Sequence, residues 1–359
     1  MLVLIIKHFF NTNFNQLSYL IYRSLISLLT SLSFSLIFGS HLITYLKKYQ
    51  IYQIIRNKGP KTHYKKQNIP TMGGLLILSS ILVSVLLWSN LLNIYIRYTL
   101  IVLIGFGIIG LIDDYKKIYF KTSKGLSSKW KLFFLSIFSI FLITIICYNT
   151  KNNFFIQLIL PIKKNVVIHI GIIYILLSYF ILVGSSNAVN LTDGLDGLAI
   201  IPVVFISIGL CILSFISGNL NCAKYFNIMY IAHINELAIF CSAIIGSGLG
   251  FLWFNTYPAK IFMGDIGSLP LGGMIGTIAI LLHQEIIFFI MSGIFIIETL
   301  SVMIQVTYFK LRKKRIFRMT PIHHHYELTT CPEPRVIVRF WIIAFVFTLL
   351  GLTCIFKIN

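Results

Sequence analysis

The segment Ile94–Lys117, IYIRYTLIVLIGFGIIGLIDDYKK, decides the fold class, because it joins a long apolar run to two adjacent carboxylates and two lysines. A helix of about 20 apolar residues is long enough to cross the hydrocarbon core of a membrane. The whole chain has this character: 57% of its 359 residues are hydrophobic and 11% are charged, whereas soluble domains carry about 25% charged residues. The sequence therefore predicts an integral membrane protein.

Ten apolar stretches of this kind follow one another along the chain. They predict an all-α, polytopic membrane protein with about ten transmembrane helices, folded as a single domain over residues 1–359. The stretches are Leu17–Leu46, Thr71–Leu92, Ile94–Ile112, Trp130–Tyr148, Ile168–Ser185, Leu198–Ser217, Ile234–Phe254, Ser268–Leu282, Ile286–Tyr308 and Val336–Phe356.

Lysine and arginine are distributed unequally between the two sides of this predicted bundle. The loops after the first, third, fifth, seventh and ninth stretches hold 22 of the 30 Lys and Arg residues. The positive-inside rule makes these loops cytoplasmic and both termini external. A formal charge of +20 could also indicate nucleic acid, but a nucleic-acid binder would not be 57% hydrophobic. The lipid bilayer is therefore the expected partner, and nucleic acid is not.

The five aspartates of the chain are sorted onto one face by the same topology. Lys and Arg alone define the cytoplasmic side, yet Asp113, Asp114, Asp193, Asp196 and Asp265 all fall at span ends on that side. Scattered solvated charges would not be sorted in this way. We expect cytoplasmic loops at about 47–70, 113–131, 186–197, 255–267 and 309–335 to form an active site.

The pair Asp113–Asp114 has two interpretations. A helix that stops there, with charges reaching for water, is as good an explanation of this motif alone as a functional one. Adjacent helical residues point about 100° apart, so the two carboxylates are not expected to face one partner in the same way. We expect one of them to address a substrate and the other to be held by a lysine.

The segment Ser185–Ala199, SSNAVNLTDGLDGLA, carries a polar residue at every third position: Asn187, Asn190, Asp193 and Asp196. Residues three apart share one side of a helix. Carboxylate and amide oxygens at this spacing suit Mg²⁺ or a polar sugar or base. A capped helix start would explain one of the four residues but not all of them, so a functional site is favoured.

Two further segments contribute to the predicted site. In Phe254–Gly273, FNTYPAKIFMGDIGSLPLGG, Asp265 stands between two glycines just ahead of a span, where a helix N-terminus and a cation held by the carboxylate could converge on phosphate. In PIHHHYEL, residues 321–328, three successive histidines diverge and can seldom share one metal. Contacts to phosphate or sugar by His323, His324 or His325 are favoured over a zinc site.

These patterns together describe a site for a water-soluble polyanion at the membrane surface. About five carboxylates near a membrane require cations to pair them, and Lys, Arg and His surround them on the same side. Diphosphate with Mg²⁺ is the natural occupant. A reaction partner embedded in the membrane would explain why the site lies at the lipid boundary.

Five segments resemble one enzyme family. The chain, from about Tyr19 to Gly351, closely resembles, with its motifs in the same order, the phospho-N-acetylmuramoyl-pentapeptide transferases, a branch of the polyprenyl-phosphate sugar-1-phosphate transferases. The segments are GLIDDYKK, NAVNLTDGLDGLA, NTYPAKIFMGDIGSLPLGG, RIFRMTPIHHHYEL and PEPRVIVRFW. The chain departs from the family pattern at two places. It has Asn68-Ile69 before PTMGG, where family members usually have Gly-Thr, and Thr330-Cys331 before PEPR, where they often have Gly-Trp. Both places are in predicted loops, so the departures concern individual contacts there and not the chemistry.

The resemblance implies a reaction, a cofactor and roles for residues. Undecaprenyl phosphate would attack UDP-N-acetylmuramoyl-pentapeptide, giving lipid I and UMP in the first membrane step of peptidoglycan synthesis, at the cytoplasmic face of the bacterial inner membrane. Asp265 would bind Mg²⁺, Asp113 would be base or nucleophile, and Asp114 its essential neighbour. A homodimer is plausible. The implied substrate contacts are Asn187, Asn190, Asp193, Asp196, Asn255 and Phe262 on the uridine side, and Lys66, Thr71, Lys131, His323, His324 and His325 toward nucleotide, phosphate or sugar.

Three alternatives remain open at this level. Transfer of an N-acetylhexosamine phosphate from a UDP-sugar would use the same diphosphate chemistry. An ion-coupled transporter would place ionisable residues near the membrane midplane, where only Glu298 is a candidate, and we expect Glu298 to be a buried structural partner whose change to Gln spares synthesis. A structural scaffold would tolerate changes at Asp113, Asp193 and Asp265.

Overall fold

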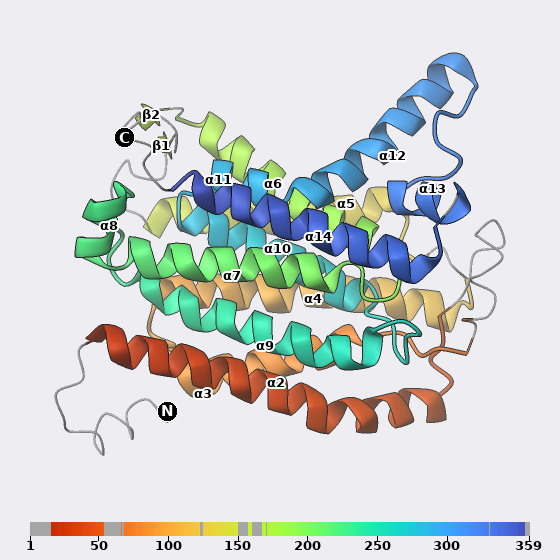
Figure 1. The fold of residues 1–359 in the computed structure, drawn as a ribbon, viewed down its shortest axis with the longest axis horizontal. Coiled ribbons are helices and arrows are strands. Elements are labelled where there is room, and N and C mark those ends of the chain that lie inside the picture. Colours follow the sequence, from red (N-terminus) through yellow and green to blue (C-terminus); the bar gives the residue numbers. More distant parts are fainter. Residues whose placement is uncertain are drawn as a thin grey trace.

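The fold is a bundle of long helices that run side by side in a computed structural model (Figure 1). The structure describes residues 16–53, 66, 68–122, 125–149, 157–159, 167–169, 171–329 and 331–355. Most of the predicted loop at 47–70, and both chain ends, lie outside these residues. The long helices are α2 (Gln16–Lys48), α3 (Gly74–Trp88), α4 (Ile94–Tyr119), α5 (Ser128–Asn149), α6 (Ile173–Thr192), α7 (Ile200–Ser217), α9 (Leu237–Asn255), α10 (Asp265–Leu281), α12 (Gly293–Arg312) and α14 (Glu333–Thr353).

The predicted membrane-protein class is confirmed. Among the described residues, eight helices are long and apolar enough to cross a membrane, and α3 and α10 are two shorter apolar helices. Apolar side chains also cover much of the outside of the bundle, including Leu25 on α2 and Phe141 on α5, each more than half exposed. Such a surface is stable against lipid tails and not against water. The chain is therefore a multi-pass membrane protein.

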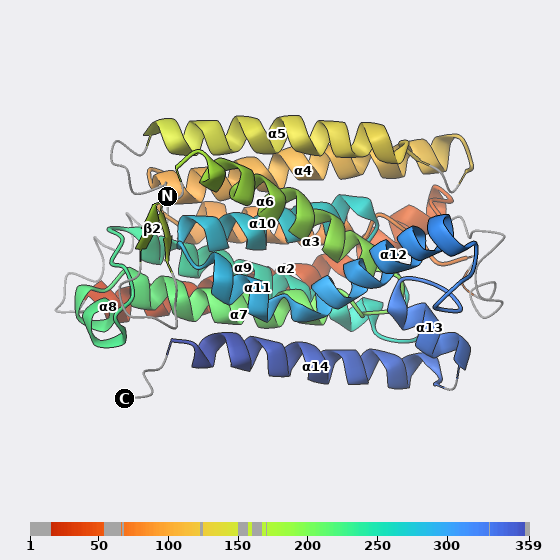
Figure 2. The ribbon, with the colours of Figure 1, turned by 90° about the horizontal axis from the view of Figure 1, so that it is seen from above.

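The two ends of the bundle differ. Helix α2 begins and α14 ends at the same end, beside the short α8 (Leu220–Phe226), whereas the short α13 (Ile322–Thr329) lies at the opposite end (Figures 1 and 2). Helix α13 carries the three histidines. The segments with the aspartates and histidines of the predicted site thus meet at one end of the molecule.

The structure departs from the all-α prediction in one small element. Strands β1 (Gln157–Ile159) and β2 (Val167–His169) form an antiparallel pair. The fifth predicted span began at Ile168, but α6 begins at Ile173, after Gly171 with a φ of 56°. Ile168, the first residue of the predicted span, is β-branched and belongs to β2, since β-branched residues favour a strand.

The ninth predicted span is also broken. A seven-residue helix, α11 (Glu285–Met291), ends at Ser292, and α12 then leaves the bundle at a wide angle (Figure 1). The splayed α12 lies beside α6 and opens a space between them that an unbroken helix packed in the bundle would fill. Hydropathy alone could not show the break, because the chain is apolar on both sides of it.

Helix α10 occupies the centre of the bundle, and all of its residues are buried. It lies against α4 at very close range: a side chain at Gly110 would overlap the backbone carbonyl of Asp265. Glycine is therefore needed at this crossing. The contact brings the last turns of α4 to the first residue of α10, which positions the site.

Candidate functional site

Three carboxylates converge where α4 meets α10. One oxygen from each of Asp113, Asp114 and Asp265 lies within 4.8 Å of the others. Helix α4 does not stop at Ile112, as the predicted span did, but continues to Tyr119. Asp113 and Asp114 are consequently inside a helix and buried, with 1% and 2% of their surfaces exposed. The interpretation as a helix stop with charges reaching for water is wrong.

Lys117, one turn further along α4, joins the three carboxylates. Its Nζ lies 2.6 Å from Oδ2 of Asp113, 3.1 Å from Oδ1 of Asp114 and 3.0 Å from Oδ2 of Asp265. We expected a lysine to hold only one aspartate of the pair. Lys117 reaches both because residues three and four apart are neighbours on a helix, and its flexible side chain spans the angle between the two carboxylates.

The second oxygens of the aspartate pair have different partners. Oδ2 of Asp114 accepts a hydrogen bond of 3.0 Å from the backbone N–H of Ile266, in the first turn of α10. Oδ1 of Asp113 accepts one of 2.8 Å from Leu126, in the loop that precedes α5. Gly264, at a φ of 73°, lets the chain enter α10 beside Asp114, which a side chain there would overlap. Asp114 is thus fixed to the bundle centre and Asp113 to a loop.

Asp265 is held from the opposite side by α5 and α6. Lys131 Nζ lies 2.7 Å from Oδ2 of Asp265 and donates to Oδ1 of Asn190 at 3.1 Å. The Asn190 amide donates to Oδ1 of Asp265 at 2.7 Å and to the Ser268 hydroxyl at 2.8 Å. Two cations and three carboxylates therefore share this cluster, which we call the carboxylate site.

A second polar cluster lies beside it. Lys66 Nζ is 2.6 Å from Oδ1 of Asp196 and 2.5 Å from Oε1 of Glu333, at the start of α14. Burial alone would lower the pKa of Lys66, but the two carboxylates outweigh it and the pKa is raised. Oδ2 of Asp196 accepts from the backbone N–H of Ala259 at 3.0 Å. Asp196 thus joins three separate segments, and it lies beyond the end of α6 at Thr192, so the expected helical spacing with Asn187 and Asn190 does not extend to it.

Asp193 stands at the end of α6 with its carboxylate half-buried. Among the residues that the structure describes, no hydrogen bond or ion pair reaches this carboxylate. Burial, followed by the charges of Asp265 and Asp114, raises its pKa to about 8. Beside it, Gly194 lies against Nε2 of His323, whose Nδ1 is 3.0 Å from Oε1 of Glu298. The expected buried partner role of Glu298 is confirmed.

The remaining predicted residues surround these clusters. Asn255 is buried: its oxygen accepts from the Gly197 N–H and its amide donates to the Ile261 carbonyl. Phe262 is half-buried, and its backbone pairs with Pro70 and Gly73, next to Thr71. The other three contact nearby groups: Asn187 donates to the Val183 carbonyl, His324 pairs with Glu327, and His325 accepts from the backbone of Arg318.

The sequence analysis missed three residues of these clusters: Lys117, Ser268 and Glu333. The spacing of Lys117 from the aspartate pair was a usable signal, because i,i+3 and i,i+4 ion pairs are common on helices. Glu333 gave no such signal, because its partner Lys66 lies far away along the chain. Within the described residues, the histidine run is not among the groups that could share a metal ion, and the carboxylate site is.

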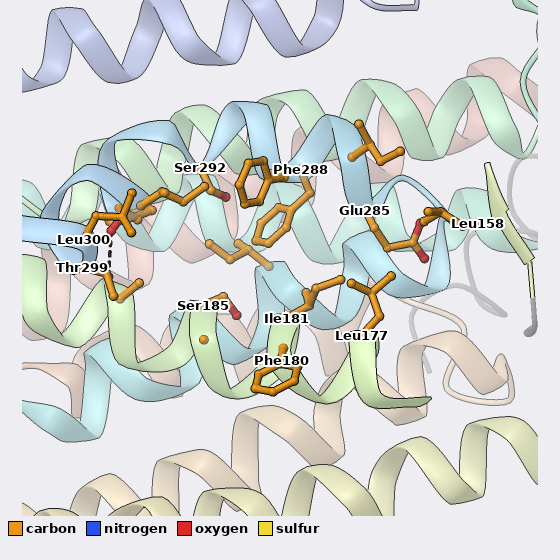
Figure 3. Close-up of a pocket in the computed structure, with 17 residues that line it drawn as sticks. Leu158, Leu177, Phe180, Ile181, Ser185, Glu285, Phe288, Ser292, Thr299 and Leu300 are labelled. Carbon is orange, nitrogen blue, oxygen red and sulfur yellow. Dashed lines mark hydrogen bonds between the residues drawn. The ribbon is translucent and has the colours of Figure 1, made fainter. Parts of the chain in front are cut away.

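An apolar cavity of about 420 Å³ opens between α6 and the broken pair α11–α12. Figure 3 shows Leu177, Phe180 and Ile181 on one wall and Phe288 on the other, with Leu300 at one end. Glu285 lies at the opposite end, where it accepts a hydrogen bond from Tyr174. The break at Ser292 creates this cavity by turning α12 away from the bundle.

Known proteins are similar to this chain over nearly its whole length. The model described as glycosyl transferase family 4 matches residues 96–283, and signature 1 of phospho-N-acetylmuramoyl-pentapeptide-transferase matches residues 66–78. A protein with that transferase name from Buchnera aphidicola subsp. Baizongia pistaciae is 59% identical over 333 residues, 93% of this chain and 98% of its own. Another, from Buchnera aphidicola subsp. Acyrthosiphon pisum (strain APS), is 55% identical over 351 residues, 98% of either chain.

Proposed function

The chain belongs to the family of phospho-N-acetylmuramoyl-pentapeptide-transferases, and on this premise we propose that it catalyses their reaction. It transfers phospho-N-acetylmuramoyl-pentapeptide from the UDP-linked precursor to undecaprenyl phosphate, giving lipid I and UMP. An oxygen of the lipid phosphate forms a bond to the β-phosphorus, and the bond from that phosphorus to the bridging oxygen of UMP breaks. The relatives' names give no support to hexosamine-phosphate transfer or to ion transport.

The carboxylate site is the observation that carries this proposal. Phosphoryl transfer depends on charge neutralisation and on in-line positioning more than on covalent chemistry. Three carboxylates with oxygens within 4.8 Å of one another, flanked by Lys117 and Lys131, provide hard oxygen donors and two positive charges in one place. Such a donor set fits Mg²⁺, with Asp265 as the proposed ligand. Bound there, Mg²⁺ would neutralise the charge of the diphosphate.

Asp113 and Asp114 are proposed to differ in role. Asp114 accepts a hydrogen bond from the first turn of α10 and so holds the end of α4 in place against Asp265. Asp113 removes any remaining proton from the lipid phosphate, which is already largely ionised because its second pKa is near 6. We favour this direct attack over a two-step route through a phospho-aspartate.

The uridine and sugar are proposed to bind on the side of Asp193. Its unpaired, half-buried carboxylate is available to a ligand, and Phe262 is exposed enough to stack on uracil. The other proposed contacts are Asn187, Asn190, Asp196, Asn255, Lys66, Thr71, Lys131, His323, His324 and His325. Of these, Asn255 and Asp196 are engaged with backbone groups, so they support the shape of the pocket through the loops that they hold.

The prenyl chain of the lipid substrate is proposed to enter the apolar cavity between α6 and α12. Its lining is almost entirely hydrocarbon, and much of it comes from α6 and α12, two helices long and apolar enough to cross a membrane. A prenyl chain gains free energy there roughly in proportion to the apolar area that it buries. The proposal also includes ten spans, external termini and a carboxylate site at the cytoplasmic face of the inner membrane. A homodimer remains part of the proposal.

One assay tests reaction type and substrate together. The purified protein is given undecaprenyl phosphate and either UDP-N-acetylmuramoyl-pentapeptide or UDP-N-acetylglucosamine, with Mg²⁺ or with EDTA. We expect lipid I only from the first nucleotide sugar and only with Mg²⁺. Asp265→Asn should abolish the product, whereas Asn221→Ala, at an exposed position of α8 at the other end of the bundle, should not. Product from the second sugar, or full activity of Asp265→Asn, would refute the proposal.

A second assay separates the two routes. The protein is incubated with the UDP-linked precursor and Mg²⁺ in the absence of lipid phosphate. Direct attack predicts no UMP beyond background hydrolysis, because the acceptor is missing. Stoichiometric release of UMP, one per protein molecule, would contradict direct attack and support the phospho-aspartate route.

A further inference from the structure

Lys117 occupies an unusual position in the carboxylate site. Its ammonium group lies within 3.1 Å of an oxygen from each of Asp113, Asp114 and Asp265. These are the same three side chains whose oxygens are close enough to share a metal ion. A lysine ammonium and a divalent cation bound by these carboxylates would therefore compete for one set of oxygens.

The second lysine of the site is held differently. Lys131 contacts only Asp265 among the three carboxylates, and it also donates to the neutral oxygen of Asn190. Its side chain is 15% exposed, against 29% for Lys117. Among the described residues, the partners of the Lys117 ammonium are all carboxylates. Lys117 is thus the lysine with a path toward solvent and with no neutral partner to retain it.

The geometry points to Lys117 as a competing cation that lowers the affinity of the carboxylate site for divalent metal until an anionic substrate gives it another partner. This inference rests on the Mg²⁺ site of the proposed function. Like charges at short range repel strongly in a partly buried site. Simultaneous binding of the ammonium and a metal ion to the three carboxylates is therefore unfavourable. The diphosphate of the substrate brings the negative charge that Lys117 needs when it leaves them.

This arrangement makes metal binding and substrate binding cooperative. Without substrate, Lys117 holds the carboxylates and metal binds weakly. With substrate, Lys117 moves to the diphosphate and the oxygens become free for metal. Because coupling of two ligands is reciprocal, metal also tightens the binding of the substrate. Lys117 is therefore a positioning residue, and its effect is seen in the affinities for metal and for substrate as well as in turnover.

Binding of Mn²⁺ in place of Mg²⁺ provides a readout that does not depend on turnover. Free Mn²⁺ is titrated by electron paramagnetic resonance against the full-length protein in detergent. We expect Lys117→Met to bind Mn²⁺ at least about tenfold more tightly than wild type, because removing a neighbouring unit charge changes such energies by more than 1.4 kcal/mol. Lys116→Met is the matched control: it removes the same charge from the adjacent exposed position and should bind as wild type does.

The titration is repeated with saturating UDP-N-acetylmuramoyl-pentapeptide. Wild type should bind Mn²⁺ much more tightly with the nucleotide sugar than without it, and Lys117→Met should show a smaller ratio. Lys117→Gln, which keeps a hydrogen-bond donor, gives a second neutral variant in case Lys117→Met does not fold. Equal Mn²⁺ affinity of wild type and both neutral variants would overturn the inference, as would an unchanged ratio.

Failure of the underlying metal proposal has a different signature. Asp265→Asn should lose tight Mn²⁺ binding if the carboxylate site holds the metal. Wild type and Asp265→Asn with the same Mn²⁺ affinity would refute the Mg²⁺ site itself. Wild-type binding that depends on Asp265 but not on Lys117 would refute only the role of Lys117.

Discussion

Oε1 of Glu298 lies 3.0 Å from Nδ1 of His323, and both side chains are completely buried. The pair joins α12, which leaves the bundle, to α13, which carries the histidine run. The hydrogen bond at Nδ1 fixes the orientation of the ring, so that Nε2 is directed at Gly194 next to Asp193. A side chain that hydropathy placed inside an apolar span therefore acts at the edge of the proposed substrate pocket.

Two substitutions of Glu298 distinguish the effect of its hydrogen bond to His323 from the effect of its negative charge. Glu298→Gln keeps an oxygen that can accept from Nδ1, so lipid I synthesis should remain close to the wild-type rate. Glu298→Leu leaves a buried N–H without an acceptor, which costs about 1–3 kcal/mol, and should lower both thermal stability and synthesis. A well-folded Glu298→Gln protein without activity would show that the charge is required, as in an ion-coupled transporter.

Lys66 should be a large contributor to stability. Lys66→Met leaves the carboxylates of Asp196 and Glu333 buried without their cation, and breaking a buried pair in this way costs about 3–5 kcal/mol. Thermal unfolding in detergent should show a clear drop, whereas Lys48→Met, at an exposed position near the end of α2, should show none. Adding Asp196→Asn and Glu333→Gln should restore part of the loss. No recovery would mean that charge burial is not its cause.

Filling the apolar cavity should affect one substrate only. A side chain at Gly184 would meet no atom within 4 Å, so Gly184→Phe can extend into the cavity without disturbing α6. We expect the KM for undecaprenyl phosphate to rise several-fold while the KM for the UDP-linked precursor stays unchanged. Leu176→Phe, on the same helix but not in the cavity lining, is the control. Equal effects of the two changes would exclude the cavity as the prenyl site.

Asp193 should make the folded protein less stable as pH rises. Its folded-state pKa is about 8, whereas an unfolded aspartate titrates near 3.9. Between about pH 4 and pH 8 the folded state binds more protons at this site than the unfolded state does, so stability falls with increasing pH. Asp193→Asn removes this contribution, and its stability advantage over wild type should grow across the range and level off above about pH 8.

Unfolding measured in EDTA checks this prediction, because a cation on the neighbouring carboxylates would weaken their effect on Asp193. Glu327→Gln is the control, because it neutralises another carboxylate at the same end of the bundle as Asp193. Parallel pH profiles for wild type and Asp193→Asn would contradict the raised pKa.

Much of the site could be predicted from residue type and spacing. Lys and Arg counts predict the side of the membrane, and on that prediction the five aspartates lie at span ends on one side. The finer geometry could not be predicted. Asp196 follows Asp193 by three positions, yet α6 ends at Thr192, so the helical spacing no longer holds and the two carboxylates have different surroundings.

The sequence by itself determined the class of the protein, the approximate spans and the gathering of its aspartates at one end, because these depend on local hydropathy and on net charge along the chain. Only the tertiary structure decided which groups are partners. Lys117 lies between Asp113 and Asp265, Lys66 between Asp196 and Glu333, and His323 against Glu298. Most of these pairs join residues far apart in the chain, and their distances are set by how closely glycine lets α4 approach α10 and by where α12 turns away.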